Sequence, residues 1–204
     1  MQKTYDAVLF DLGGVLIDID YSATEIEFKK LGVLDFQERY TQFAQNALFD
    51  RFECGEISAQ HFINLLLPHT QLGTTANQIV AAWSAMLGTF PLEKISLLKV
   101  LSATMPLFML SNTNALHWSG VQRAWSSVST QPMTDFFEEI YLSHVIGKRK
   151  PHPETFLWVC QQMGFDPAKV LFIDDSPQHI EGAALAGLQV HYYQRPAEFY
   201  ALFS

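Results

Sequence analysis

The chain has 204 residues, a formal net charge of −8 and a sequence pI of about 5.3. Its 49% hydrophobic and 17% charged residues are typical of a folded globular protein, which excludes a largely disordered chain. The negative charge disfavours nucleic acid and anionic membranes as partners, since the longest basic run is only Lys148-Arg149-Lys150. With two cysteines, no secretory hydrophobic segment and no run of 18 apolar residues, we expect a cytoplasmic protein without a membrane span. Composition leaves the oligomeric state open.

An apolar run at residues 7–10 leads directly into Asp11 and then into Gly13 and Gly14. A short apolar run that is bounded by turn residues predicts a strand buried on both faces, as in a parallel sheet. Asp11 would then lie at the carboxyl end of the strand, where open α/β sheets place their ligands. Taken alone, the pattern fits equally well a turn that Asp11 caps and the two glycines shape.

From residue 22 to about residue 89 the pattern is helical and contains no strand-like run. Ser22 and Glu25 have the spacing of a capping box, so we expect a helix that begins there and ends at Gly32. Further helices are predicted over residues 35–49, after Ser58, and from Thr74 or Thr75 to residue 87, with a loop at 51–57. We therefore expect residues 18–89 to form an all-helical cap.

Strands and helices alternate in the remainder of the chain. The predicted strands cover residues 106–110, 139–142, 169–173 and 189–193, and the predicted helices cover 92–101, 115–125, 153–163 and 177–186. This alternation indicates an α/β fold with a doubly wound, Rossmann-like parallel sheet. Residues 1–17 and 90–204 would form this discontinuous core, with the helical cap inserted after the first strand.

Polar residues that could act in catalysis or bind a metal fall at the predicted strand ends. Asp11, Ser111 and the pair Asp174-Asp175 each follow a strand, and Lys150 precedes a helix. A parallel sheet brings these ends to one edge, where three carboxylates would repel one another unless a divalent cation and the lysine compensate. Oxygen ligands favour Mg²⁺. Such a site suits phosphoryl transfer, with Asp11 as nucleophile, Ser111 on the phosphate oxygens and Lys150 as their charge partner.

Four ordered motifs carry a resemblance to a known family. Phe10-Asp11-Leu12-Gly13-Gly14-Val15, Leu110-Ser111-Asn112, Arg149-Lys150-Pro151 and Phe172-Ile173-Asp174-Asp175-Ser176 resemble the motifs of the haloacid dehalogenase superfamily, over nearly the whole chain. The helical insert resembles the cap of its subclass I members, and the motif set looks closest to bacterial phosphatases of α-glucose 1-phosphate and related sugar phosphates. The resemblance implies a Mg²⁺-dependent phosphatase of small phosphate esters.

The resemblance also implies a role for each matched residue. Asp11 would be the nucleophile that becomes an aspartyl-phosphate, and Lys150 its charge partner. Ser111, with Asn112 and Gly14, would bind the substrate. The metal would be held by Asp11, the backbone carbonyl of Gly13, Asp174 and Asp175.

Gly13 departs from the family pattern. Most phosphatases of the superfamily have a second aspartate at this position, which acts as general acid and base, a role typically worth about 10²–10⁴-fold in rate. An anomeric phosphate would suffer least from its absence, because a hemiacetal oxygen leaves readily. Gly13 equally fits an alternative, a weakened or non-catalytic protein that binds a phosphate ligand. A 2-haloacid dehalogenase is a third possibility, which the Asp174-Asp175 pair disfavours because that chemistry needs no metal.

Other residues near the junctions and in the cap have weaker signals. We expect Asp18 and Asp20 to serve as hinge and helix-capping residues, and His61 and His69 to be ordinary helix-surface residues. No ligand spacing supports a transition-metal site at His144, His152 or His179. Phe49, Phe52 and the loop to Ile57 are candidates for substrate contact, because a cap loop can lie over the pocket.

Overall fold

The computed structural model describes residues 5–34, 36, 47–195, 200 and 202–203. Five parallel strands form one sheet in the order β3-β2-β1-β4-β5. They are β1 (Ala7–Phe10), β2 (Leu107–Ser111), β3 (Glu139–Leu142), β4 (Val170–Asp174) and β5 (Gln189–Tyr192). β1 lies at the centre, where Phe10 is paired with Met109 on one side and Ile173 on the other. The predicted doubly wound parallel sheet is confirmed.

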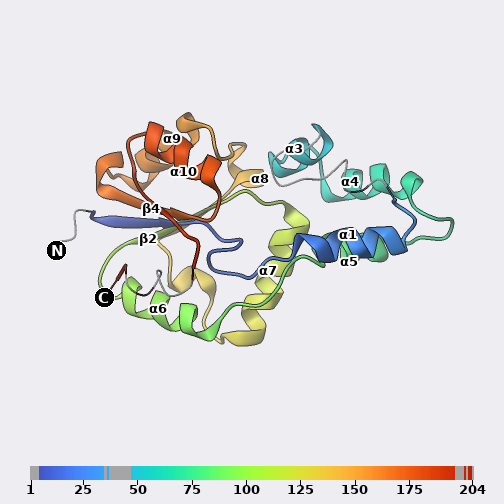
Figure 1. Ribbon diagram of the computed structural model, residues 1–204, viewed down its shortest axis with the longest axis horizontal. Coiled ribbons are helices and arrows are strands. Elements are labelled where there is room, and N and C mark those ends of the chain that lie inside the picture. Colours follow the sequence, from blue (N-terminus) through green and yellow to red (C-terminus); the bar gives the residue numbers. More distant parts are fainter. Residues whose placement is uncertain (1–4, 35, 37–46, 196–199, 201, 204) are drawn as a thin grey trace.

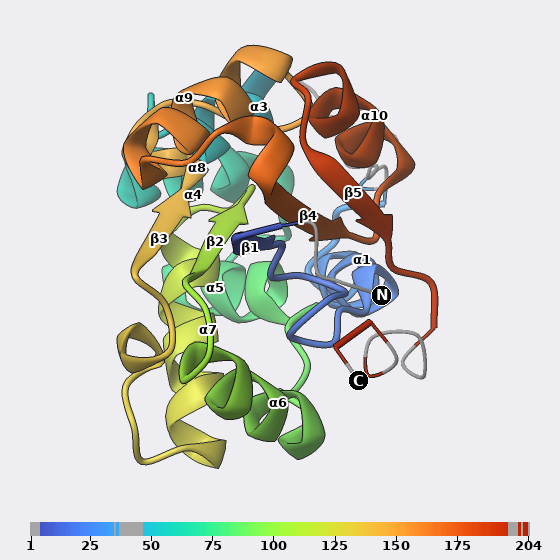
Figure 2. The same cartoon turned by 90° about the vertical axis from the view of Figure 1, so that its left-hand side faces the viewer.

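Helices cover both faces of this sheet (Figure 2). One face carries α6 (Leu92–Ser102) and α7 (Ala115–Val128), and the other carries α9 (Pro153–Met163) and α10 (Pro177–Leu185). α8 (Ser143–Ile146) is a single turn after β3, and three 3₁₀ helices complete the helical elements of the described chain: η1 (Leu67–His69), η2 (Met133–Asp135) and η3 (Pro167–Lys169). Val8 and Phe10 point to the α6 and α7 side, whereas Ala7 and Leu9 point to the other, as the alternation of a strand requires.

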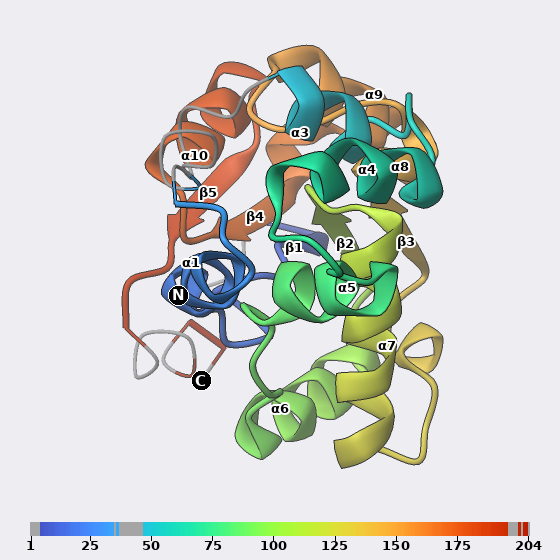
Figure 3. The same ribbon diagram turned by 90° about the vertical axis from the view of Figure 1, so that its right-hand side faces the viewer.

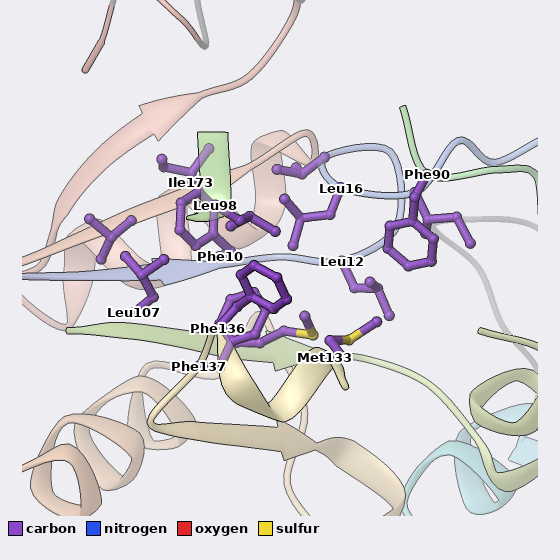
Figure 4. Close-up of a cluster of buried hydrophobic side chains, with 14 of the residues drawn as sticks. Phe10, Leu12, Leu16, Phe90, Leu98, Leu107, Met133, Phe136, Phe137 and Ile173 are labelled. Carbon is purple, nitrogen blue, oxygen red and sulfur yellow. The ribbon is translucent and has the colours of Figure 1, made fainter. Parts of the chain in front are cut away.

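The loop after β1 is fixed by apolar packing. Leu12 and Leu16, together with Val15 and Ile17, are buried in the same cluster as Phe10 (Figure 4). The loop also bonds to itself, because Gly14 N donates to the Ile17 carbonyl at 2.8 Å. Because this loop follows directly from the central strand, its packing holds Asp11 and Gly13 in one place.

A second group of helices lies beyond the carboxyl ends of the strands (Figures 1 and 3). It consists of α1 (Tyr21–Lys30), α3 (Ala47–Glu53), α4 (Ala59–Leu66) and α5 (Ala76–Ser84). These helices share a hydrophobic cluster whose fully buried members come from residues 28–83, with Phe49 stacked on Trp83 at 5.2 Å between ring centroids. A cap with its own core is what the all-helical pattern predicts.

Two chain segments connect the cap to the core and pair with each other. Asp18 N donates to the Thr89 carbonyl at 3.0 Å, and Gly88 N donates to the Asp18 carbonyl at 2.9 Å. Ile19 and Leu87 form an antiparallel bridge. We propose that this pairing marks the cap boundaries, with residues 18–89 as the cap and 1–17 and 90–204 as the core. Of the described helices, none combines the length and the apolar character needed to cross a bilayer.

Helix starts in the cap agree with the sequence pattern in two cases and differ in others. Ser58 caps α4, and Thr75 forms a capping box with Gln78 at α5. The expected capping box at Ser22 is wrong: α1 begins at Tyr21, and the Asp20 carboxylate accepts from Ser22 N at 3.0 Å. Residues 51–53 belong to α3 and not to a loop, because Phe52 packs in the cap core one turn after Phe49. Most of the predicted helix at 35–49 lies outside the described residues.

Candidate active site

Three carboxylates meet at the carboxyl ends of β1 and β4. Asp11, Asp174 and Asp175 each offer an oxygen, and these oxygens lie within 4.8 Å of one another. The two strand ends are tied together, since Asp11 N donates to the Ile173 carbonyl at 2.9 Å. In the part of the chain that the structure describes, no other group of three or more aspartate, glutamate, histidine or cysteine side chains has metal-binding spacing.

Lys150 bridges two of these carboxylates. Its side chain is fully buried, and Nζ donates to Asp11 Oδ1 at 2.6 Å and to Asp174 Oδ2 at 2.7 Å. Asn112 holds the lysine backbone on both sides, because Lys150 N donates to Asn112 Oδ1 and Asn112 Nδ2 donates to the Lys150 carbonyl, both at 2.9 Å. The Asn112 amide, expected to contact substrate, is thus engaged in positioning Lys150. A substrate contact from Asn112 would come from its backbone.

Asp174 is fully buried and saturated with donors. Besides Lys150, it accepts from Ser176 N at 2.7 Å, and His179 Nδ1 lies 3.0 Å from both of its oxygens. A carboxylate only accepts, so this contact places a proton on Nδ1 of His179. The sequence places His179 near a motif but gives it no ligand spacing, and its signal is its place in the first turn of the helix that follows the Asp174-Asp175 pair.

The charges of the site shift the pKa values of its members in different directions. Burial raises the pKa of Asp11, although Lys150 opposes this. Burial, with the charges of Asp11 and Asp174, raises the pKa of Asp175 to about 7. For Asp174 burial also acts upward, but Lys150 and His179 outweigh it, so its pKa is lowered. One lysine therefore does not compensate the negative charge of all three carboxylates, and the remaining charge favours binding of a further cation.

The two glycines after Asp11 have distinct surroundings. Gly14 has a φ of 76°, and a Cβ there would lie 2.0 Å from Asp175 Oδ2. Its absent side chain makes room for the Asp175 carboxylate, which is a packing role different from the substrate contact expected of it. Gly13 lines the pocket in an ordinary backbone conformation, and a Cβ there would lie 3.3 Å from Ile19 Cγ1.

A pocket opens above the carboxylates, between core and cap. Asp11, Asp175 and Ser111 line its core end, and Tyr21, Glu53 and Met86 line it from the cap. Ser111 is buried at the end of β2, in the place expected for a phosphate-binding hydroxyl. The remaining lining residues are mostly polar at the core end and apolar near the linkers: Leu12, Gly13, Ile17, Ile19, Leu87, Asn112, Thr113, His117, Val121, Arg149, Ser176, Gln178 and His179.

His117 lies at this pocket but is committed to a structural network. Its Nε2 is 2.8 Å from the Trp83 carbonyl and its Nδ1 is 3.1 Å from Asn114 Nδ2, while Trp83 Nε1 donates to Asn114 Oδ1 at 3.2 Å. Burial lowers the pKa of His117 to about 4, so the ring is neutral at pH 7. The network ties α5 of the cap to α7 of the core. His117 is therefore no candidate for the proton donor that Gly13 lacks.

The other cap residues considered from the sequence lie elsewhere. Phe49 and Phe52 are not substrate contacts: each is 1% exposed, because both pack into the aromatic core of the cap, where Phe49 stacks on Trp83 and Phe52 on Phe62. Glu53, the next residue, faces the pocket instead. Asp20 caps α1 as expected. His61 and His69 are exposed and do not line the pocket.

Known proteins resemble this chain in sequence and in fold. The haloacid dehalogenase-like hydrolase family matches residues 5–187. A D-ribitol-5-phosphate phosphatase from Bacteroides thetaiotaomicron is 30% identical over 173 residues, which are 85% of this chain and 84% of that protein. A phosphatase from Mycobacterium tuberculosis is 22% identical over 94% of this chain and 88% of its own.

Solved structures of related enzymes have the same fold as this chain. A HAD family enzyme from Bacteroides thetaiotaomicron, in complex with magnesium and inorganic phosphate, superposes with a TM-score of 0.90 at 32% identity, covering 98% of this chain and 100% of that one. A 2-haloacid dehalogenase from Pseudomonas syringae, at 18% identity and a TM-score of 0.60 over 93% of this chain and 86% of that one, shares the fold. The extent of the family match and the identity to the first relative place this chain in the haloacid dehalogenase-like hydrolase family.

Proposed function

We propose that this hydrolase is a Mg²⁺-dependent phosphatase of small phosphorylated sugars and sugar alcohols. The observation that carries the proposal is the cluster of Asp11, Asp174 and Asp175 bridged by the buried Lys150 at the end of a pocket. A serine hydroxyl, from Ser111, lines the same end. Catalysis of phosphoryl transfer asks mainly for this combination of positioned nucleophile and compensated oxygen charge.

The donor set fits a magnesium ion. All three side chains offer hard oxygen ligands, and the pKa of about 7 at Asp175 reflects its burial first and then the negative charges of Asp11 and Asp174. We propose Asp11, Asp175 and the Gly13 carbonyl as ligands. Asp174 stays a predicted ligand as well, although its oxygens already accept from Lys150, Ser176 and His179. When bound, the ion neutralises charge that develops on the phosphate oxygens.

Each residue of the site would then have its own role in the reaction. The Asp11 carboxylate would attack phosphorus, the bond from phosphorus to the ester oxygen would break, and the leaving oxygen would take its proton from water, because Gly13 offers none. Water then attacks the aspartyl-phosphate, which releases inorganic phosphate and regenerates Asp11. Lys150 orients Asp11 through the 2.6 Å contact to Oδ1. The Ser111 hydroxyl would donate a hydrogen bond to a phosphate oxygen.

The substrate class is supported by a relative and by the lining of the pocket. The relative from Bacteroides thetaiotaomicron acts on D-ribitol 5-phosphate and covers 85% of this chain. Here Tyr21, Glu53 and Gln178 line the part of the pocket away from the phosphate end. Phenol, carboxylate and amide groups bind hydroxyls well. A small polyol or sugar carrying one phosphate fits this lining.

The test is release of inorganic phosphate from a panel that includes ribitol 5-phosphate, glucose 1-phosphate and glycerol 3-phosphate. We expect release with Mg²⁺ and none after chelation by EDTA. Activity that survives EDTA would contradict the proposal. Chloride release from a 2-haloacid would favour the dehalogenase alternative, and tight vanadate binding without turnover would favour the non-catalytic one.

Magnesium should stabilise the protein more at pH 8 than at pH 6. Because the pKa of Asp175 is raised from its ordinary value of 3.8 to about 7, the folded protein loses stability as the pH rises between these values, and the full cost of ionising Asp175 is present at pH 8, where a bound cation would offset it. Below pH 7 the ion must displace a proton, so it binds less tightly. Thermal unfolding with and without 5–10 mM Mg²⁺, roughly the concentration range needed for weak sites, measures the effect. An equal shift of Tm at both pH values would contradict it, and Asp175→Asn should abolish the shift.

Adding a carboxyl group at position 13 should favour esters with poor leaving groups. Gly13 has no positive φ and a Cβ there meets only Ile19, so Gly13→Asp is tolerated. Its carboxyl would join three others, which raises its pKa and keeps it a proton donor near pH 7. We expect kcat/KM for glycerol 3-phosphate to rise about tenfold or more relative to p-nitrophenyl phosphate. Gly13→Asn, of equal size without the acid, is the control. A gain in Gly13→Asn, or in neither variant, would show that leaving-group protonation is not limiting.

A further inference from the structure

We infer that Glu53 determines substrate specificity: its carboxylate accepts hydrogen bonds from the hydroxyls of a neutral polyol and repels phosphate esters that carry a second anionic group. This inference rests on the proposed function and names the kind of substrate that the same site selects. It assigns to one cap residue a choice that the phosphate end of the pocket cannot make, because every phosphate ester presents the same group there.

Glu53 is held over the pocket by the docking of the cap. It is the last residue of α3, its side chain is 9% exposed, and it lines the pocket that Asp11 and Asp175 line from the core. Two residues on, Gly55 has a φ of 72° and packs against the core so closely that a Cβ would lie 2.1 Å from the His144 carbonyl oxygen. The end of α3 is thereby seated on α8, and Glu53 with it.

Arg149 fixes the carboxylate from the core side. Its Nη2 lies 3.1 Å from Glu53 Oε2, and its Nη1 pairs with Asp50, one turn earlier on α3. Arg149 is the neighbour of Lys150, whose Nζ contacts the proposed nucleophile. Glu53 is therefore positioned relative to the reacting end through one ion pair, to the residue that precedes Lys150 in the chain.

Among the described residues, Glu53 is the one acidic side chain that lines the pocket from the cap. Arg149, the one lysine or arginine among the described lining residues, divides its charge between Glu53 and the partly exposed Asp50. A carboxylate is an acceptor only, so it favours hydroxyl donors and opposes a second phosphate or carboxylate. In a partly desolvated site that opposition is worth more than in water.

Glycerol 3-phosphate and 3-phosphoglycerate form a matched pair of probes, because the second has a carboxylate where the first has a hydroxymethyl group. We expect the wild-type protein to prefer glycerol 3-phosphate, measured as the ratio of the two kcat/KM values with Mg²⁺. Glu53→Gln keeps the size and removes the charge, and should lower that ratio about tenfold. The fall should come from a lower KM for 3-phosphoglycerate, together with a higher KM for glycerol 3-phosphate, whose hydroxyls lose a charged acceptor.

Asp50→Asn is the matched control. Asp50 pairs with the same arginine, but its side chain is 43% exposed and it does not line the pocket. In Asp50→Asn the ratio of the two kcat/KM values should stay within about twofold of wild type, because an exposed ion pair contributes little. An equal fall of the ratio in both variants would overturn the inference, because the effect would then pass through Arg149. An unchanged ratio in Glu53→Gln would overturn it too.

A binding readout separates this inference from the proposed function. The same two esters are compared by the rise in Tm that each produces in the presence of Mg²⁺. If no ester is hydrolysed, the proposed function fails, yet the ratio of the two ligand effects still reports on Glu53. Preference for glycerol 3-phosphate that is lost in Glu53→Gln supports the inference, and equal stabilisation by both esters contradicts it.

Discussion

Replacing Asp11 by asparagine is expected to lower the rate of phosphate release by at least about 10³-fold and to leave the protein folded. The amide has the size of the carboxylate but cannot attack phosphorus. Asp11 is buried at the end of the central strand, and its nearest charged partner, Lys150, retains Asp174 when the Asp11 charge is removed. The loss should therefore be chemical and not structural.

The measurement is kcat for the best ester of the panel, with thermal unfolding recorded on the same preparation. Asp20→Asn is the matched control, since it makes the same chemical change at a residue that caps α1 and does not line the pocket. Asparagine caps helices about as well as aspartate, so this control should keep its rate within about twofold. An Asp11→Asn protein that retains a tenth of the wild-type rate would rule out Asp11 as the nucleophile.

Replacing Lys150 by methionine is expected to cost about 3–5 kcal/mol of folding free energy, because it leaves buried charges without their partner. The lysine is fully buried and contacts two carboxylates at 2.6 and 2.7 Å. Although burial acts to lower the pKa of Lys150, Asp11 and Asp174 outweigh it and raise the pKa, so the lysine is charged in the folded protein. Methionine fills a similar volume, so the loss reports the charge and not a cavity.

Urea denaturation of the metal-free protein gives this free energy. Lys148→Met is the control: Lys148 is half-buried and lies 5.9 Å from the ring centroid of Trp158, a contact worth about 0.5–1 kcal/mol. The two substitutions are chemically identical and two residues apart. If both variants lose the same stability, Lys150 is not the charge partner that holds the site together.

The inner strands β1, β2 and β4 could be predicted from the sequence because each is a short apolar run that leads into a polar residue, whereas the edge strands β3 and β5 include polar residues. α9 was predicted at both ends, since Pro153 occupies its first turn and Gly164 adopts the left-handed conformation that stops a helix. α8 was not predicted, because one turn at Ser143–Ile146 is too short to show a period. The start of α1 was misplaced since Asp20 and Ser22 are both good caps. The pairing of the two linkers favours Asp20 as the cap, because Asp20 N donates to the Met86 carbonyl and is thereby held outside the helix.

The candidate site divides in the same way. Topology alone brings Asp11, Ser111 and the Asp174-Asp175 pair to one edge, so the sequence sufficed to place them together. Contacts between the cap and the core depend on how two separately packed units meet, and no local pattern encodes them. The pairing of Arg149 with Glu53 is of this kind. The engagement of Asn112 with Lys150 lies within the core, but it joins residues 38 positions apart and is not encoded by a local pattern either. Gly14 likewise could be predicted only as a turn residue. Its close approach to Asp175, which follows β4, depends on the tertiary structure.

Phosphate release from ribitol 5-phosphate, before and after removal of divalent metal by EDTA, tests the central claim most directly. The arrangement of Asp11, Lys150 and Asp175 predicts steady release with Mg²⁺, loss of release on chelation, and recovery when Mg²⁺ is returned in excess. Release that continues unchanged in EDTA, or no release from any ester of the panel while vanadate still binds, would contradict a magnesium-dependent phosphatase.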